Sequence, residues 1–168
     1  MKKDSVWVIV EIPKGSRNKY EYDYDLGRIK LDRMLFSSVQ YPTDYGFIPE
    51  TLAEDGDALD AMVLVSEPTY PLVAIESRPI GLFRMWDEKG EDEKILCVPL
   101  HDPNWNFAHS LKDLPPHILL EIEHFFSVYK DLEKKKVGIE GWDTAKHALA
   151  AIEESRKRFQ EKGLPKKK

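Results

Sequence analysis

Residues 54–65 read EDGDALDAMVLV, an acidic turn followed at once by an apolar segment. In an extended strand, successive side chains point to opposite faces. The segment Ala61–Val65 is therefore apolar on both faces, and Asp60 shares a face with Met62 and Leu64. This pattern predicts a buried strand with a charged residue at its end.

The first two-thirds of the chain contains further segments of this kind. Turn signals such as Pro13-Lys14-Gly15 and Glu88-Lys89-Gly90 separate them. Short apolar or alternating runs predict strands at Val6–Ile12, Lys19–Tyr24, Ile29–Arg33, Ala61–Val65, Ile80–Met85 and Lys94–Val98.

The last third of the chain has helical spacing of its apolar residues. One helix is predicted within Ile118–Leu132, and a second follows an N-cap at Asp143 or Thr144 and runs to about Phe159. Many short strands followed by helices favour an α+β domain built on a small, closed or highly curved β-barrel.

Composition predicts one domain and excludes several classes of binder. The chain has 168 residues, 42% of them apolar, which suits a single domain over residues 1–161 with a Lys-rich tail at 162–168. Outside that tail there are 21 basic and 30 acidic residues. An acidic balance argues against a general nucleic-acid or anionic-membrane binder, which needs a basic face.

Targeting signals are weak. The single cysteine, Cys97, cannot form an intrachain disulfide, so no residue pattern indicates an oxidising compartment. Met1-Lys2-Lys3 looks like the start of a signal peptide, but the apolar run Val6–Val10 is too short for its hydrophobic region. No segment approaches the roughly 18 apolar residues of a membrane span. We therefore expect a soluble, cytoplasmic protein with no membrane partner.

Four predicted strands have a charged residue at one end. These charged residues are Glu11, Arg33, Asp60 and Lys94, and each shares a face with apolar neighbours. Any one of them is explained by a strand end reaching solvent. Four together, with both signs of charge, favour a polar mouth on an apolar barrel.

The segment Lys19–Asp25 alternates strictly between tyrosines and charged residues. Taken alone, this alternation favours an edge strand with one solvated face, and it indicates no site.

The acidic turn at Asp55, Asp57 and Asp60 is the densest chemical feature. An Asp-Gly step allows a tight turn that could bring the three carboxylates together. Because like charges repel, such convergence requires cations, and oxygen ligands suit Mg²⁺, Mn²⁺ or Ca²⁺. The spacing does not fit an EF-hand, and a solvated acidic turn remains the alternative.

A second acidic run, Asp87–Lys94, is typical of a hairpin turn. In a strand, Asp92 and Lys94 would share a face and place a metal ligand beside a phosphate ligand. The five histidines show no metal-binding spacing, and the sequence contains neither GxGxxG nor GxxxxGK[ST].

Taken together, these motifs resemble the soluble family I inorganic pyrophosphatases of the bacterial type. The resemblance runs from about Val8 to Trp142. The matching pieces are Glu11-Ile12-Pro13, Lys19-Tyr20-Glu21, Asp32-Arg33, Tyr41-Pro42, Asp44-Tyr45-Gly46, Asp55–Asp60, Arg78-Pro79-Ile80-Gly81, Asp87–Lys94, His124-Phe125-Phe126 and Tyr129–Glu133.

The resemblance implies a five-stranded OB-like barrel flanked by C-terminal helices, with the active site at the barrel mouth. It implies hydrolysis of inorganic diphosphate to two phosphates, with Mg²⁺ as cofactor and a metal-activated water at a multi-metal carboxylate site. The implied metal ligands are Glu11, Glu21, Asp55, Asp60, Asp87 and Asp92. The implied phosphate ligands are Lys19, Arg33, Tyr45, Lys94, Tyr129 and Lys130.

Individual roles also follow from the resemblance. Asp55, Asp60 and Asp92 would hold the first Mg²⁺, and Asp60 would bridge to the second. Asp57 matches the general base. Asp87, with Asp92 and Glu11, would serve a further metal, and Glu21 a fourth near the leaving phosphate. Tyr41 lies near the site in the family.

Two positions depart from the family pattern. Ala58 stands where Pro or Glu is usual, and Val128 stands where many bacterial relatives carry a second helix histidine. Relatives of this length are commonly homohexamers, so the resemblance implies a homohexamer.

Two other functions compete with diphosphate hydrolysis. An OB-like barrel could bind oligonucleotides, which the acidic balance opposes. A non-catalytic divalent-cation-binding module would explain the aspartates, but Lys19, Arg33, Lys94 and Lys130 would weaken its cation binding.

Overall fold

Five strands form a closed ring in the computed structural model, which describes residues 4–165. Around the ring, each strand pairs with the next, and β6 returns to β1. Only the β5–β7 pair is parallel among these five pairs. The order is β1 (Val6–Ile12), β4 (Asp44–Phe47), β5 (Asp60–Val63), β7 (Gly90–Pro99) and β6 (Ala74–Asp87). The expected five-stranded OB-like barrel is confirmed.

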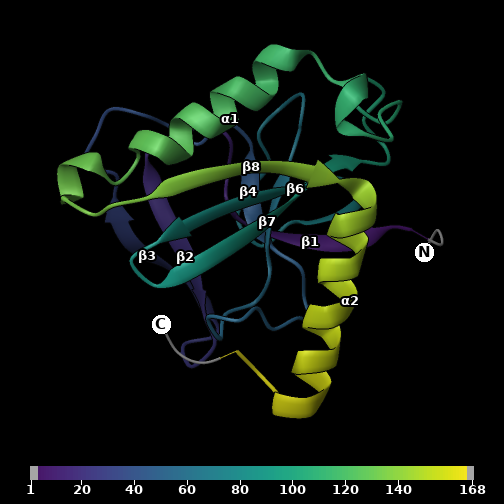
Figure 1. Ribbon diagram of the computed structural model, residues 1–168. Coiled ribbons are helices and arrows are strands. Elements are labelled where there is room, and N and C mark those ends of the chain that lie inside the picture. Colours follow the sequence, from purple (N-terminus) through teal and green to yellow (C-terminus); the bar gives the residue numbers. More distant parts are fainter. Residues whose placement is uncertain (1–3, 166–168) are drawn as a thin grey trace.

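The other elements lie around this barrel. Strand β8 (Gly138–Thr144) extends the sheet beyond β6, and β2 (Asn18–Asp23) and β3 (Arg28–Met34) form a separate antiparallel hairpin. Helix α1 (Pro116–Val128) and helix α2 (Ala145–Lys162) lie on different sides of the strands (Figure 1). Two short 3₁₀ turns, η1 (Leu111–Asp113) and η2 (Asp131–Glu133), flank α1.

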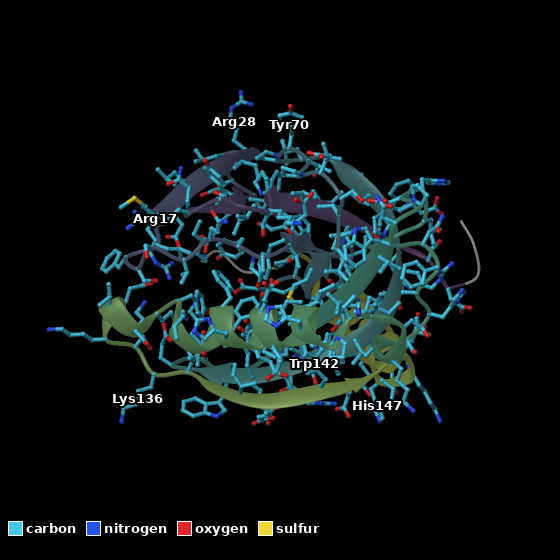
Figure 2. All side chains as sticks on the ribbon, turned by 90° about the horizontal axis from the view of Figure 1, so that it is seen from above. Arg17, Arg28, Tyr70, Lys136, Trp142 and His147 are labelled. Atoms are coloured by element: carbon cyan, nitrogen blue, oxygen red, sulfur yellow. The ribbon has the colours of Figure 1, made fainter. Side chains whose placement is uncertain are left out.

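All five strands of the ring contribute buried apolar side chains to the core, and Figure 2 shows the side chains on the ribbon from above. Arg28 and Tyr70 project outward on the side opposite β8, and Tyr70 is 76% exposed. Of the described helices, none is both long enough and apolar enough to span a membrane.

The alternation of each buried strand divides its side chains between two cores. In β5, Ala61 and Val63 pack against α2, while Met62 packs on the other side of the strand with residues of α1. The α2-side core includes Val6, Val8, Leu82, Ile95, Cys97, Ala148 and Ile152. The α1-side core includes Tyr41, Tyr45, Met62, Leu64, Phe83, Met85, Leu96, Phe125, Phe126 and Tyr129.

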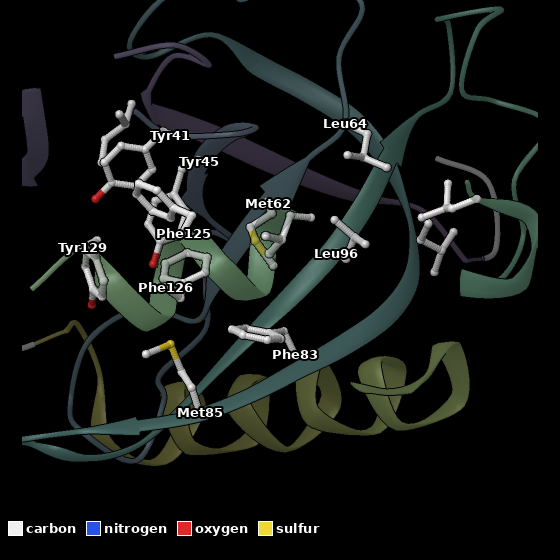
Figure 3. Close-up of a cluster of buried hydrophobic side chains, with 14 of the residues drawn as sticks. Tyr41, Tyr45, Met62, Leu64, Phe83, Met85, Leu96, Phe125, Phe126 and Tyr129 are labelled. Atoms are coloured by element: carbon white, nitrogen blue, oxygen red, sulfur yellow. The ribbon is translucent and has the colours of Figure 1, made fainter. Parts of the chain in front are cut away.

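The α1-side core has an aromatic end and an aliphatic end. Tyr41, Tyr45 and Tyr129 lie together at one end, and Leu64 and Leu96 lie at the other (Figure 3). Tyr41 packs against Phe125 with ring centroids 4.8 Å apart. Because tyrosine combines an apolar ring with a polar hydroxyl, it suits the boundary between a core and a polar cavity.

Strand β1 departs from the strict alternation of a regular strand, in which Val6, Val8, Val10 and Ile12 would share one face. Its register with β4 shifts between Val10 and Ile12, which indicates a bulge or similar irregularity. Val6 and Val8 lie in the α2-side core, whereas Ile12 lies in the α1-side core. The extra residue of a bulge changes the face on which later side chains lie. The opposite face is only partly buried, since Trp7 is 44% exposed.

Some boundaries differ from the predicted ones. Strands β4 and β8 were not predicted, because β4 is four residues long with a central glycine and β8 contains Gly138 and Gly141. Helix α1 ends at Val128 rather than at Leu132, and α2 runs three residues beyond Phe159. Thr144 is the N-cap of α2, and Gly163 is its C-cap with φ +82°.

The tail and the start of the chain lie mostly outside the described residues. Lys162, the first residue assigned to the tail, is the last residue of α2. Lys166–Lys168 and Met1–Lys3, on which the expectations of a tail and a signal-like start rest, are outside the described range.

Gly46 allows β1 and β4 to approach closely. A Cβ added there would overlap the carbonyl oxygen of Ile9 and lie 2.9 Å from the Cα of Val10. Since both atoms belong to a paired backbone, we expect Gly46→Ala to lower the free energy of unfolding by about 3 kcal/mol in urea denaturation.

Gly81→Ala is the matched control. The three atoms nearest its added Cβ would be side-chain atoms of Leu111, and a side chain can rotate away more easily than a backbone. A loss of stability as large at Gly81 as at Gly46 would contradict this account.

Candidate active site

A cavity of about 320 Å³ is lined by side chains from β1, β2, β3, β4, β5, β6, β7 and the end of α1. All thirteen site residues predicted from the sequence line it. They are Glu11, Lys19, Glu21, Arg33, Tyr45, Asp55, Asp57, Asp60, Asp87, Asp92, Lys94, Tyr129 and Lys130.

The centre of the cavity is a buried ion cluster around Lys94. In the parallel register of β5 and β7, Asp60 lies opposite Lys94. The Lys94 Nζ donates to Asp60 Oδ2 at 3.0 Å and to the two Asp92 oxygens at 2.8 and 2.9 Å. Lys94 is only 2% exposed, and its ammonium lies 5.2 Å from the centre of the Phe126 ring. Asp92 and Lys94 thus share a face, as predicted.

Tyr45 completes this cluster. Its hydroxyl donates to Asp60 Oδ2 at 2.5 Å and accepts from Lys94 Nζ at 2.8 Å. Burial, followed by the charge of Asp60, raises the pKa of Tyr45 well above its ordinary value. Tyr45 therefore remains a neutral donor.

Opposing effects set the protonation of the buried pair. Burial alone would lower the pKa of Lys94, but Asp92 and Asp60 outweigh burial and raise it. Burial also raises the pKa of Asp92, with Lys94 acting against it and Asp60 adding to it. Two carboxylates share one ammonium here, so a further positive charge would stabilise both.

A second cluster joins α1 to the β6–β7 hairpin. Lys130 Nζ donates to Asp87 Oδ2 at 2.8 Å and to Glu88 Oε2 at 3.1 Å. Burial opposes ionisation of Glu88, but its own backbone N–H and Lys130 lower its pKa to about 2. The hairpin predicted at Asp87–Lys94 is confirmed, with Gly90 at φ +119° in its turn.

A third cluster lies on the β2–β3 hairpin. Lys19 contacts Glu21 and donates to Asp32 Oδ2 at 3.0 Å, and Arg33 Nη1 donates to the same oxygen at 2.6 Å. The alternation of this strand alone favoured a solvated face. That interpretation was wrong for Lys19 and Glu21, because the hairpin packs its charged face toward the cavity.

The acidic turn folds back on itself. Gly56 has φ +90°, and the Asp57 N–H donates to Asp55 Oδ1 at 2.9 Å. The Ala53 N–H also donates to the Asp57 carbonyl at 2.7 Å. The first of these bonds is that of an Asx turn, and Asp55, Asp57 and Asp60 all line the cavity. Glu11 also lines the cavity and accepts from the Tyr22 N–H at 2.7 Å.

The donor set fits a hard divalent cation. Among the described residues that line the cavity there is neither histidine nor cysteine, and all acidic ligands are carboxylates. Within residues 4–165, no three such side chains are already gathered at metal-binding distance. Lysine ammonium groups lie between the carboxylates instead. The convergence of Asp60 and Asp92 on the Lys94 ammonium shows that this pair holds positive charge.

The sequence interpretation missed several cavity residues. They are Tyr20, Lys30, Asp32, Glu88, Lys89 and Lys135, and Tyr41 is also among the lining residues. Asp32 and Glu88 each adjoin a residue that was predicted, Arg33 and Asp87. Adjacent residues point to opposite faces of an ideal strand. Both residues of such a pair can therefore reach the cavity only where the strand bends or turns.

Comparison with known proteins agrees with this geometry. The family model described as "Inorganic pyrophosphatase" matches residues 8–160. The inorganic pyrophosphatase of Methanosarcina mazei is 54% identical over 92% of this chain and 91% of its own length. That of Streptomyces coelicolor is 54% identical over 93% of this chain and 96% of its own length.

Solved structures give the same result for the fold. The crystal structure of inorganic pyrophosphatase from Thermus thermophilus matches with a TM-score of 0.91 and 45% identity. The match covers 95% of this chain and 93% of that one. The enzyme from Helicobacter pylori matches with a TM-score of 0.91 and 39% identity, over 94% of each chain.

The Lys94 cluster yields a prediction about stability. Lys94→Met removes the ammonium and leaves Asp60 and Asp92 as buried, adjacent carboxylates. We expect the free energy of unfolding in metal-free buffer to fall by about 3 kcal/mol. Mg²⁺ should restore part of this loss and stabilise the variant more than the wild type, as measured by urea denaturation with and without Mg²⁺.

Lys157→Met is the matched control, because Lys157 is an exposed residue of α2. Its stability should change by less than about 0.5 kcal/mol. Equal stability of Lys94→Met and wild type in metal-free buffer would contradict the assigned role of Lys94.

Proposed function

This chain belongs to the inorganic pyrophosphatase family, and from that premise we propose how its cavity hydrolyses diphosphate with the help of Mg²⁺. The chain is an inorganic diphosphatase, and inorganic diphosphate is its substrate. It is a metal-dependent enzyme. What remains to be assigned is the metal and the work of each side chain.

The observation that best supports this function is the mixture of charges in one cavity. Nine carboxylates and seven basic side chains line it. A site that only held cations would have no use for seven basic groups, and a site that only held anions would exclude nine carboxylates. A cation-rich complex of a polyanion needs both sets, and metal-bound diphosphate is such a ligand.

The carboxylates are assigned to Mg²⁺. Asp55, Asp60 and Asp92 would hold the first ion, and Asp60 would bridge to a second. Bound divalent ions would neutralise diphosphate and make the attacking water more acidic. The all-oxygen donor set supports Mg²⁺ over zinc. Asp87 with Glu11 and Asp92 would hold a further ion, and Glu21 a fourth.

The basic and phenolic groups are assigned to the phosphates. Lys19, Arg33 and Lys130 would bind phosphate oxygens, together with Tyr45, Lys94 and Tyr129. Burial raises the pKa of Tyr129 above its ordinary value, so its hydroxyl is a neutral donor. Donors fixed in place before the reaction stabilise the charge that develops on the leaving phosphate.

Asp57 is assigned as the general base that takes a proton from the attacking water. It lines the cavity together with Asp55 and Asp60, and the turn bonds fix its backbone. A carboxylate held at one place beside the reacting water can contribute strongly to the rate. Ala58, which departs from the family pattern, leaves this turn and its hydrogen bonds in place.

We also propose a homo-oligomer, specifically a homohexamer, located in the cytoplasm. Several large apolar side chains are exposed on the single chain, including Leu31, Met34, Phe36 and Leu132, each at least half exposed. Exposed apolar residues of this size support the proposal that part of this surface is covered in an assembly. Light scattering coupled to size-exclusion chromatography measures the assembly mass directly, and a monomer would contradict the proposal.

Cys97 is buried and unpaired, which is compatible with a reducing compartment.

Asp57→Asn tests the base. We expect kcat for diphosphate with saturating Mg²⁺ to fall by about 10²–10⁴-fold, because general base catalysis contributes that much. Phosphate release should be measured over time, with ATP as a second substrate and with EDTA to remove metal. Wild-type turnover should be selective for diphosphate and should disappear in EDTA.

Asp143→Asn is the matched control, since this carboxylate pairs with Arg84 and lies outside the cavity lining. It should keep wild-type turnover. Turnover that survives in Asp57→Asn would remove Asp57 from the role of base. No turnover by folded, Mg²⁺-loaded wild type would favour the non-catalytic cation-binding alternative.

A further inference from the structure

Arg33 contacts two carboxylates that come from different parts of the chain. On one edge of its guanidinium, Nη2 donates to Glu133 Oε2 at 3.0 Å, and Nε lies 2.9 Å from Glu133 Oε1. On the other edge, Nη1 donates to Asp32 Oδ2 at 2.6 Å. Burial alone would lower the pKa of Arg33, but Glu133 and then Asp32 raise it, so Arg33 is fully charged.

The two carboxylates differ in burial. The Glu133 side chain is 5% exposed, whereas that of Asp32 is 31% exposed. A buried carboxylate that faces a guanidinium with both oxygens is costly to remove, because its charge would be left without a partner. A partly exposed carboxylate can return to water at little cost. Glu133 is therefore a permanent contact, and Asp32 is a displaceable one.

Local backbone structure keeps Glu133 in place. It ends the η2 turn, in which its N–H donates to the Lys130 carbonyl at 3.0 Å. The next residue, Lys134, adopts a left-handed conformation with φ +57°. The same turn follows directly on Tyr129 and Lys130, so one short segment presents two assigned phosphate ligands and also holds a third, Arg33, from across the cavity.

The Asp32 carboxylate lies between two cationic side chains, where an anion would bind. Its Oδ2 accepts from Lys19 Nζ at 3.0 Å and from Arg33 Nη1 at 2.6 Å, so one oxygen bridges two cationic groups. Burial would raise the pKa of Asp32, but Lys19 and Arg33 lower it, and the carboxylate is ionised near neutral pH. A phosphate oxygen placed between the same two donors would make the same contacts.

We propose that Glu133 is a positioning residue that anchors one edge of the Arg33 guanidinium, while Asp32 occupies the other edge until a phosphate group of the substrate replaces it. The proposal rests on the assignment of Lys19 and Arg33 to phosphate binding. Without Glu133, Arg33 would be free to pair with the cavity carboxylates. Without Asp32, the phosphate donors would be available from the start.

The test compares Glu133→Gln, Glu133→Asp and Asp32→Asn with the wild type. Each protein is assayed for kcat and KM with diphosphate and saturating Mg²⁺, and methylenediphosphonate binding is measured by calorimetry in the same buffer. Losing one charge-assisted contact should raise KM and weaken methylenediphosphonate binding about tenfold in Glu133→Gln. Its kcat should change less than its KM, and Glu133→Asp should recover part of the affinity.

Asp32→Asn should have the opposite effect. Removing the competing charge should lower KM and tighten methylenediphosphonate binding by about threefold. Glu153→Gln is the matched control, because Glu153 forms an exposed helical ion pair with Arg156 and should not affect either constant.

The outcomes separate this proposal from the proposed function. Wild type that fails to hydrolyse diphosphate would overturn the function itself. Active wild type with an unchanged KM in Glu133→Gln, or with loss of thermal stability alone, would overturn the positioning role of Glu133. If Glu133→Gln does not fold, the measurements on Asp32→Asn and Glu133→Asp still test the proposal. An unchanged or raised KM in Asp32→Asn overturns displacement, and wild-type constants in Glu133→Asp overturn anchoring.

Discussion

The buried ammonium of Lys94 is the interaction on which the cavity depends. It lies inside a barrel wall, 2% exposed, and two carboxylates and one phenol converge on it. This convergence requires the parallel pairing of β5 with β7, which sets Asp60 opposite Lys94. A register shifted by one residue would move one of the charges to the other face, into the α2-side core, whose members carry no charge to pair with it. The closed barrel and the ion cluster therefore stabilise the same register.

Two segments that lie outside the barrel bring further cavity groups to this centre. The β2–β3 hairpin brings Lys19 and Arg33, and the end of α1 brings Tyr129 and Lys130. Neither segment pairs with the barrel strands through a sheet among the described residues. Ion pairs connect them instead: Arg33 reaches Glu133 at the end of α1, and Lys130 reaches Asp87 on β6. The polar side of the cavity is held by charge pairing, and its apolar side by Phe125 and Phe126.

Much of this arrangement could be predicted from the sequence, for a simple physical reason. In short buried strands the alternation is reliable, so Asp60 with Met62 and Leu64, and Asp92 with Lys94, were placed on the correct faces. The shift in β1 broke the rule at Ile12, since an irregularity leaves no clear mark in the residue types. Lys19 and Glu21 illustrate the other limit. Periodicity indicates that a strand has a charged face, but whether water or a cavity covers that face depends on packing between distant segments.

The pairing of cavity cations with cavity carboxylates has a consequence for binding order. On the proposed assignment, Lys94 and Lys130 are phosphate ligands, yet each is now bonded to assigned metal ligands, Asp60, Asp92 and Asp87. An ammonium that turned to a phosphate oxygen alone would leave buried carboxylates without a counterion, at a cost of several kcal/mol. If a carboxylate bound a divalent ion while no phosphate was bound, the buried ammonium would lose its partner and be repelled by the charge of that ion. Binding of metal and binding of diphosphate therefore favour each other, and by linkage each must raise the affinity for the other by the same factor.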